Sequence, residues 1–321
     1  MSNLQIGDAI QVTIQRYDPT RDSAPYYKTY TVPYQRQMRV LEAIEYIAEF
    51  LDESLAYQWF CGVKKCGMCG VMVNGRPMLA CWEGVQAEMV IEPLPNFAVV
   101  RDLVIDRSRY VRDMLALQPF LHRKLPYSGF PEPLSPLQMA GAAEAMHCIE
   151  CMLCVAVCPA YGPEFVGPAA LVQLAKVALD PRDGVSRARV AAEVGGIAHC
   201  VSCYQCTQAC PLGIHVLETC IDGLRRQVAH QGLGEVARHH RVYEELVLEQ
   251  GLVNPSTLMV RSLGWKVIGE LPLAWLLFLR GRLSLGKLIK GLLKRDRLKS
   301  QPQIRALAQA VEEIDWEAEI R

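Results

Sequence analysis

The sequence has no excess of charge of either sign, with 34 Lys and Arg residues against 34 Asp and Glu residues in 321. Nucleic-acid-binding domains normally carry a basic excess, so this balance argues against a nucleic-acid partner. No stretch approaches the roughly 20 apolar residues that a membrane-spanning helix needs. The longest candidate, residues 271–279, contains Pro272 and is followed by Arg280. The sequence therefore predicts a soluble or peripheral protein that does not bind nucleic acid.

A secretion signal is also missing, because no basic segment followed by an apolar run comes after Met1-Ser2-Asn3. We therefore expect a reducing compartment, where disulfides are rare and clustered cysteines bind metals or carry out redox chemistry. Cysteine is abundant: the chain has 13, and 12 of them fall into three tight groups. Only Cys220 stands alone, and we interpret it as a buried thiol that acts as a small apolar residue.

The first group has the spacing Cys-x4-Cys-x2-Cys, with a fourth cysteine further on, which is typical of a plant-type [2Fe–2S] site. The predicted ligands are Cys61, Cys66, Cys69 and Cys81. Gly62, Gly67 and Gly70 leave room for the loop to wrap a cluster, with backbone N–H groups directed at the sulfurs. The alternative is structural zinc, but zinc sites usually use two Cys-x2-Cys pairs and this group has one.

The second and third groups repeat the run Cys-x2-Cys-x2-Cys-x3-Cys-Pro, at residues 148–159 and 200–211. In two-cluster ferredoxins the fourth cysteine of each run ligates the other cluster. Three ligands on a tight turn cap one cluster, while the cysteine before proline begins a segment that leads away. One predicted [4Fe–4S] ligand set is Cys148, Cys151, Cys154 and Cys210. The other predicted set is Cys158, Cys200, Cys203 and Cys206.

No independent catalytic site is predicted, because the histidines have no nucleophile or carboxylate pattern around them. These histidines are His199, His215, His230, His239 and His240. His199 precedes Cys200, so one alternative is that it tunes a cluster by hydrogen bonding. We favour an ordinary surface or core histidine.

The first hundred residues have the pattern of strands around one helix. Apolar and polar residues alternate in 9–17 and 27–32, and apolar residues recur at helical spacing in 40–51. Asn74-Gly75 predicts a tight turn between strands at 71–73 and 78–80, and 88–94 predicts a last strand. Helices are expected at residues 98–117, 168–179, 185–194 and 216–231, with a Pro-rich connector at 126–136. The last ninety residues look helical, with breaks at Gly251, Pro255, Gly264 and Pro272.

A plant-type motif followed by two bacterial-type runs resembles the iron–sulfur subunit of succinate dehydrogenase and fumarate reductase. The resemblance covers roughly residues 5–230 and extends beyond the cysteines, to residues 16–19, 94–104, 164–170 and 180–183. It implies an α+β fold in three parts. These are an N-terminal β-grasp plant-type ferredoxin domain (1–105), an all-α bacterial-ferredoxin-like domain (106–235) and a helical C-terminal extension (236–321).

The resemblance also implies a non-catalytic electron-transfer subunit of a succinate:quinone-type oxidoreductase. Its expected partners are a flavoprotein subunit with covalent FAD, where succinate and fumarate are interconverted, and a membrane anchor that leads to the quinone pool. The expected location is cytoplasmic, peripheral on the inner face of the cytoplasmic membrane. Alternatives are an electron carrier for another flavoprotein or for a thiol-coupled reductase, and a zinc-stabilised scaffold.

Two departures from the family pattern matter. Most members lack a cysteine at the position of Cys203 and hold [3Fe–4S] there, so the extra thiolate predicts a second [4Fe–4S] cluster, as in an unconventional archaeal-like branch. The family's quinone-site His and Trp are absent, since Val201 follows Cys200 and Tyr161 stands after Ala160. The segment from Cys200 onward also resembles the ferredoxin-type subunit of heterodisulfide reductase, which implies a heterodisulfide-reductase-like membrane-side partner.

The C-terminal extension carries a basic stretch from Arg280 to Lys299. Apolar residues on one helical face are Leu285, Leu288, Ile289, Leu292 and Leu293, with Lys287, Lys290 and Lys294 opposite. Such a helix lies in a membrane interface or docks on an anchor subunit, whereas the plain alternative is an ordinary surface helix. The acidic residues 312–319 are expected to form a solvated helix or tail.

Overall fold

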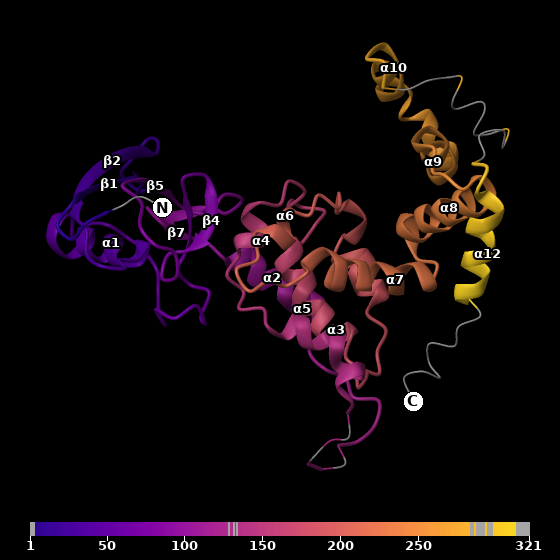
Figure 1. Ribbon diagram of the computed structural model, residues 1–321, viewed down its shortest axis with the longest axis horizontal. Coiled ribbons are helices and arrows are strands. Elements are labelled where there is room, and N and C mark those ends of the chain that lie inside the picture. Colours follow the sequence, from indigo (N-terminus) through magenta and orange to yellow (C-terminus); the bar gives the residue numbers. More distant parts are fainter. Residues whose placement is uncertain are drawn as a thin grey trace. The chain divides into compact units, whose positions relative to one another are not determined.

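The computed structural model describes residues 4–127, 129–130, 132, 134–282, 286, 293 and 298–312 (Figure 1). The chain divides into two compact units, Met1–Leu224 and Arg225–Arg321. The strand-rich part and both repeated cysteine runs lie in the first unit. The boundary expected at residue 105 therefore falls inside one compact unit.

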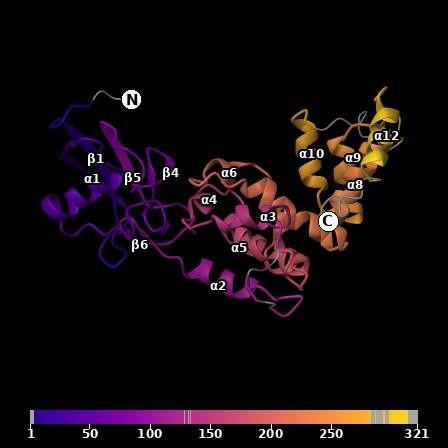
Figure 2. The ribbon, with the colours of Figure 1, turned by 60° about the horizontal axis from the view of Figure 1, so that its bottom comes forward.

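The first unit begins with a mixed five-stranded sheet in the order β2-β1-β5-β3-β4 (Figures 1 and 2). Its strands are β1 (Ala9–Arg16), β2 (Tyr26–Pro33), β3 (Gly70–Val73), β4 (Arg76–Leu79) and β5 (Glu88–Glu92). β1 and β5 are parallel, and the other pairs are antiparallel. Ile10, Val12 and Ile14 of β1 are fully buried, as the alternation in the sequence predicts.

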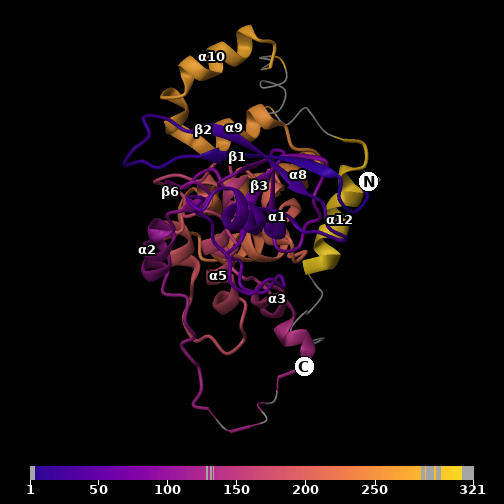
Figure 3. The same ribbon diagram turned by 90° about the vertical axis from the view of Figure 1, so that its left-hand side faces the viewer.

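The predicted helix and tight turn are both present. α1 (Val40–Tyr46) continues into the π-helical turn η1 (Ile47–Leu51) and lies against the sheet (Figures 1 and 3). Its buried residues are spaced by three and four, which places them on the face turned to the core. Asn74 and Gly75 both have positive φ, at 49° and 74°, and join β3 to β4. Positive φ at both central residues matches the right-handed twist of a hairpin.

The helix expected over residues 98–117 begins later than predicted. Residues 99–105 form instead a small antiparallel pair, β6 (Val99–Arg101) and β7 (Val104–Ile105), and the helix α2 covers Ser108–Leu117. The β-branched residues of this segment favour strands. In addition, Asp102 takes a left-handed turn conformation between the strands, with φ at 46°.

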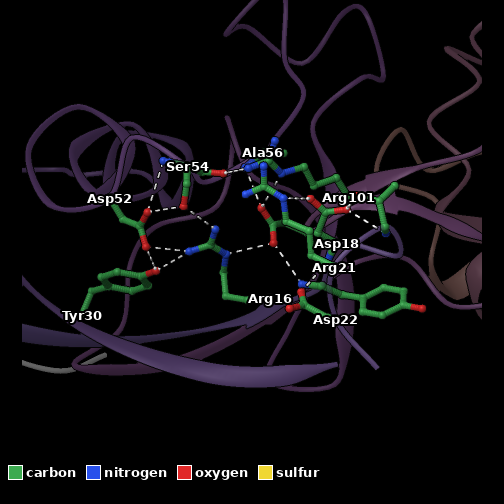
Figure 4. A network of polar contacts seen from close by, with 12 residues as sticks. Arg16, Asp18, Arg21, Asp22, Tyr30, Asp52, Ser54, Ala56 and Arg101 are labelled. Atoms are coloured by element: carbon green, nitrogen blue, oxygen red, sulfur yellow. Dashed lines mark hydrogen bonds and ion pairs between the residues drawn. The ribbon is translucent and has the colours of Figure 1, made fainter. Parts of the chain in front are cut away.

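Long-range polar contacts hold that turn in place (Figure 4). The Asp102 carboxylate accepts hydrogen bonds from the backbone N–H groups of Tyr17 (3.0 Å) and Ala56 (2.9 Å) and from Nε of Arg16 (2.9 Å). The Arg16 guanidinium also binds the Asp52 carboxylate and the Tyr30 hydroxyl. This buried network joins β1, the segment after η1 and the β6–β7 turn, and the local sequence pattern does not reveal it.

The central helix of the first unit is α5 (Pro168–Ala178), which is buried along almost its whole length and packs against α2 and three other helices. The others are α3 (Pro136–Met146), α4 (Leu153–Ala156), η2 (Val190–Val194), η3 (Ile197–His199), α6 (Gln205–Gln208) and η4 (Val216–Ile221), and α7 (Asp222–His230) follows. The helix expected at 185–194 is shorter, starting at residue 188. Arg187 is the reason, because it pairs with Asp183 (2.7 Å) and donates to the carbonyls of Gln118 and Phe120.

The described part of the second unit is helical, as predicted. It contains α8 (Gly234–Gln250), α9 (Pro255–Leu263), η5 (Gly264–Ile268), α10 (Leu271–Leu279) and α12 (Gln301–Glu312). The breaks at Gly251, Pro255 and Gly264 occur where expected, but Pro272 lies in the first turn of α10 and starts that helix. The expected basic amphipathic helix and most of the acidic end lie outside the described residues. Within the described residues, no helix is long and apolar enough to cross a membrane.

Candidate iron–sulfur sites

The first cysteine group lies on the loop that leads into β3 and on the segment after β4. Cys69 immediately precedes β3, and Ala80 donates a backbone hydrogen bond to the Cys69 carbonyl (3.0 Å), so the hairpin returns Cys81 to the loop. Cys69 and Cys81 are buried, and Cys61 and Cys66 are partly exposed. The thiols of Cys66 and Cys81 are electrostatic neighbours of Cys69. The structure thus brings together the four residues predicted for one site.

The loop directs backbone N–H groups at one of its sulfurs. Sγ of Cys61 accepts hydrogen bonds from the N–H groups of Val63 (3.4 Å), Lys65 (3.3 Å) and Cys66 (3.3 Å). These bonds lower the pKa of Cys61 to about 7, because they stabilise the thiolate. Since the thiolate is the metal ligand, this loop is built to hold a metal-bound sulfur.

Two cavities hold the cysteines of the repeated runs. The larger, judged by the space between its lining atoms, is lined by Cys148, Cys151, Cys154 and Cys210. The smaller is lined by Cys158, Cys200, Cys203 and Cys206. Each cavity therefore combines three cysteines of one run with the fourth of the other, which is the grouping predicted from the spacing.

The two runs have the same strained backbone. Glu150 and Met152 flank Cys151 with φ values of 54° and 66°, and Ser202 and Tyr204 flank Cys203 with 54° and 64°. Residues other than glycine rarely adopt this left-handed conformation, which costs roughly 1–2 kcal/mol each. Successive turns of this kind point N–H groups into one concavity, where they stabilise an anion. Because the same left-handed conformation occurs at equivalent positions of both runs, we infer that it shapes the two cavities.

Burial raises the pKa of six of the twelve motif thiols and keeps those six protonated in the absence of a compensating positive charge. It raises the pKa of Cys69 and of Cys206 to about 12 and that of Cys151 to about 11. Bound iron supplies such a charge, and a coordinating thiol is then deprotonated. The donor set, four thiols around each cavity, fits iron–sulfur clusters. Within the described part of the chain, no three His, Cys, Asp or Glu side chains form a group that could hold a single metal ion.

The first loop packs directly on the second run. A Cβ atom on Gly67 would lie 2.3 Å from the carbonyl oxygen of Ile149, and one on Gly70 would lie 2.9 Å from that of Cys151. Real Cβ atoms do not approach an oxygen so closely, so both positions require glycine. The first site and the larger cavity therefore adjoin each other through backbone contact.

Three residues near the sites have no signal in the cysteine motifs. The Asn96 side chain donates to the carbonyls of Val155 (2.9 Å) and Cys158 (3.1 Å), at the end of α4. Nζ of Lys176 donates to the Cys148 carbonyl (3.4 Å), and Arg107 lies beside Gly67 and Glu150. Sequence reasoning missed all three because their partners lie 28–62 positions away.

Cys220 and His199 lie apart from this chemistry. Cys220 is fully buried in η4, and burial raises its pKa to about 12, which suits an inert apolar thiol. Nδ1 of the half-exposed His199 side chain lies 3.7 Å from the Glu164 carboxylate. This position suits the ordinary histidine that we favour.

Two known families match the chain. The family described as a 2Fe-2S iron-sulfur cluster binding domain matches residues 11–112, and that described as a 4Fe-4S dicluster domain matches residues 144–214. The fumarate reductase iron-sulfur subunit of Haemophilus influenzae is 36% identical over 221 residues, or 63% of this chain and 86% of that protein. The Mycobacterium tuberculosis protein of the same name is 35% identical, over 64% of this chain and 88% of its own length.

Two further relatives extend the comparison. One subunit of the fumarate reductase (CoM/CoB) of Methanothermobacter marburgensis is 30% identical over 75% of this chain, which spans only 49% of that protein. A chain in the structure of the Mycobacterium smegmatis Sdh1 complex in the apo form has a TM-score of 0.64 and 27% identity. The match covers 70% of this chain and 96% of that one.

The contact at Gly67 is testable against a matched position. Gly67 and Gly75 both have positive φ, at 69° and 74°, but a Cβ on Gly75 meets nothing within 4 Å. We expect Gly67→Ala to lose [2Fe–2S] content and to unfold at lower denaturant, whereas Gly75→Ala bears only the left-handed penalty of about 1–2 kcal/mol. Iron content, visible absorption and denaturant unfolding measure both effects. Equal effects of the two substitutions would show that the contact with Ile149 contributes nothing.

Proposed function

Because this chain belongs to the family of iron–sulfur subunits of succinate dehydrogenase and fumarate reductase, we propose a specific form of that family's electron transfer. The chain is the electron-transfer subunit of an oxidoreductase complex and has [2Fe–2S] and [4Fe–4S] domains. In the proposed form it carries three clusters in succession and performs no substrate chemistry. The observation that supports this most directly is the gathering of its twelve motif cysteines into three sets.

We assign a plant-type [2Fe–2S] cluster to the first set and cubane clusters to the two cavities. When bound, such clusters accept and release single electrons. The chain's own residues hold them by thiolates, direct N–H groups at the sulfurs and exclude water through the buried α5. The mixed sheet crossed by α1 is assigned as the β-grasp domain, and the helices around α5 as the bacterial-ferredoxin-like domain.

The contacts between sites support an order of transfer. The first loop adjoins the second run at Gly67 and Gly70. Cys154 of the larger cavity is an electrostatic neighbour of Cys206 of the smaller one. Electrons therefore pass from the first site through the larger cavity to the smaller one, or the reverse.

The surface around the first loop suits a partner protein. Phe60 is 81% exposed, and Trp59, Val63 and Trp82 are also exposed. Lys64 lies over the Trp82 ring, 5.1 Å from its centroid. Exposed aromatic residues with a nearby cation are typical of interface centres. We propose that an FAD-bearing flavoprotein docks here, where succinate and fumarate are interconverted.

The membrane-side end of the path is proposed to be unconventional. Cys203 lines the smaller cavity with three other cysteines, so this site has a fourth thiolate for a fourth iron. The match to the Methanothermobacter marburgensis fumarate reductase (CoM/CoB) protein also covers more of this chain than the matches to the shorter subunits do. We therefore propose a heterodisulfide-reductase-like partner and, as the second candidate function, electron transfer in a thiol-coupled reductase.

The helical extension is proposed to make the contact with this partner or with the membrane surface. α10 has no buried residue, and Leu271, Trp275 and Leu279 are strongly exposed. Arg280 and Arg282 follow it directly. An apolar helix with adjacent basic residues suits the inner face of a cytoplasmic membrane, where anionic lipids gather.

The identity of the third cluster is tested by Cys203→Ser, with Cys220→Ala as the matched control outside the motifs. We expect Cys203→Ser to convert this cluster to [3Fe–4S], with loss of about one iron per chain and a new EPR signal in the oxidised protein. Cys220→Ala should keep the iron of the wild type. A Cys203→Ser protein with unchanged iron and unchanged spectra would contradict a ligand role for Cys203.

The partner assignment is tested by purifying the tagged full-length chain from its own cells. We expect a covalently flavinylated subunit to copurify and to oxidise succinate or reduce fumarate. Copurification of a flavoprotein that acts on neither compound would favour the second candidate function. A colourless protein that contains zinc would contradict both.

A further inference from the structure

Arg107, directly before α2, lies between the first cysteine loop and the second run. Its Nη2 donates to the carbonyl of Gly67 (3.2 Å), and its Nη1 donates to the carbonyl of Glu150 (3.2 Å). Nη1 also lies 3.7 Å from Sδ of Met68. Gly67 and Met68 stand between Cys66 and Cys69, and Glu150 precedes Cys151. A single guanidinium therefore bridges ligand loops of two different sites.

This guanidinium is a partly buried cation for which no ion pair is found in the described part of the chain. Its Nη groups donate to backbone carbonyls, and its buried Nε has no hydrogen-bond acceptor in the described part of the chain. Burial lowers the pKa of Arg107, and the neighbouring acidic groups of Cys151, Tyr110, Glu150 and Cys66 act in the opposite direction. A buried unpaired charge is destabilising unless an opposite charge lies nearby.

The sites on either side supply that opposite charge. Four thiolates and the sulfide ions outweigh the charge of the irons, so clusters ligated by four cysteines are anionic. Cys66 belongs to the first set and Cys151 to the second, and both are electrostatic neighbours of Arg107. Reduction adds a further negative charge, which a fixed cation in a region of low dielectric constant stabilises.

We infer that Arg107 is a shared electrostatic residue that raises the reduction potentials of both the first and the second cluster. This inference rests on the proposed function and adds a positioning residue that lies outside every cysteine motif. Lys176 provides the contrast, because it donates to the Cys148 carbonyl (3.4 Å) and acts on the second site. The competing explanation is that Arg107 is only a structural clamp between the two carbonyls.

The test is a redox titration followed by EPR on the full-length chain, with iron counted in every variant. Arg107→Gln should lower both potentials, each by about 59 mV, which corresponds to a roughly tenfold weaker reduction equilibrium for one electron. Arg107→Lys, which keeps the charge, should stay much closer to the wild type. Lys176→Met should lower the second potential alone. The third cluster should not change in any of these variants.

Two results would overturn the inference. One is an iron-replete Arg107→Gln protein in which neither or only one of the two potentials falls. The other is an Arg107→Lys protein that shifts as far as Arg107→Gln, which would identify a clamp. If Arg107→Gln loses iron, Arg107→His decides instead, because its imidazole carries a positive charge only below a pKa of about 6.5. Relative to the wild type, both potentials should fall as the pH rises through that range, and an unchanged pH dependence would refute the idea. A wild-type chain without clusters would refute the proposed function instead.

Discussion

The burial of negatively charged sulfur is the constraint on which the rest of this structure depends. Twelve thiols converge in three small regions, and burial alone would keep six of them neutral. The fold offsets this cost with backbone N–H groups on Cys61, with paired left-handed residues around Cys151 and Cys203, and with Arg107. Each of these features has little purpose in a protein that holds no anionic group.

The second constraint is distance, since electron transfer needs adjacent sites. Glycine brings the first loop and the second run close together, because Gly67 and Gly70 have no Cβ atoms and the two backbones can touch. The exchange of the fourth cysteine also brings the two cavities close together. Each cavity is lined by three cysteines of one run and by the fourth cysteine of the other run. Stability and transfer thus depend on the same contacts.

The sequence alone predicted the features whose determinants are local. Regular cysteine spacing indicated the three groups, alternation indicated β1 and β2, and Asn74-Gly75 indicated the β3–β4 turn. It failed where distant partners decide the conformation. Asp102 turns the chain because Arg16, Tyr17 and Ala56 bind its carboxylate, so residues 99–105 are strands and not helix.

Residues 185–187 likewise lie outside the expected helix. Arg187 pairs there with Asp183 and donates to the carbonyls of Gln118 and Phe120, which lie far away along the chain. Arg107 and Asn96 were likewise invisible in a single sequence, because the groups that give them meaning lie far away along the chain. The motif-based ligand assignments remain predictions, although the structure groups their residues as expected. The chemistry of the sites was thus more predictable than the residues that surround and tune them.

The central claim is that all twelve motif cysteines hold iron. The most direct measurement counts iron, acid-labile sulfide and zinc in the anaerobically purified full-length chain. The account predicts about ten irons per polypeptide, since a plant-type site holds two and each cubane site four, with a matching amount of sulfide and no zinc. Fewer than about six irons, or stoichiometric zinc in their place, would contradict it.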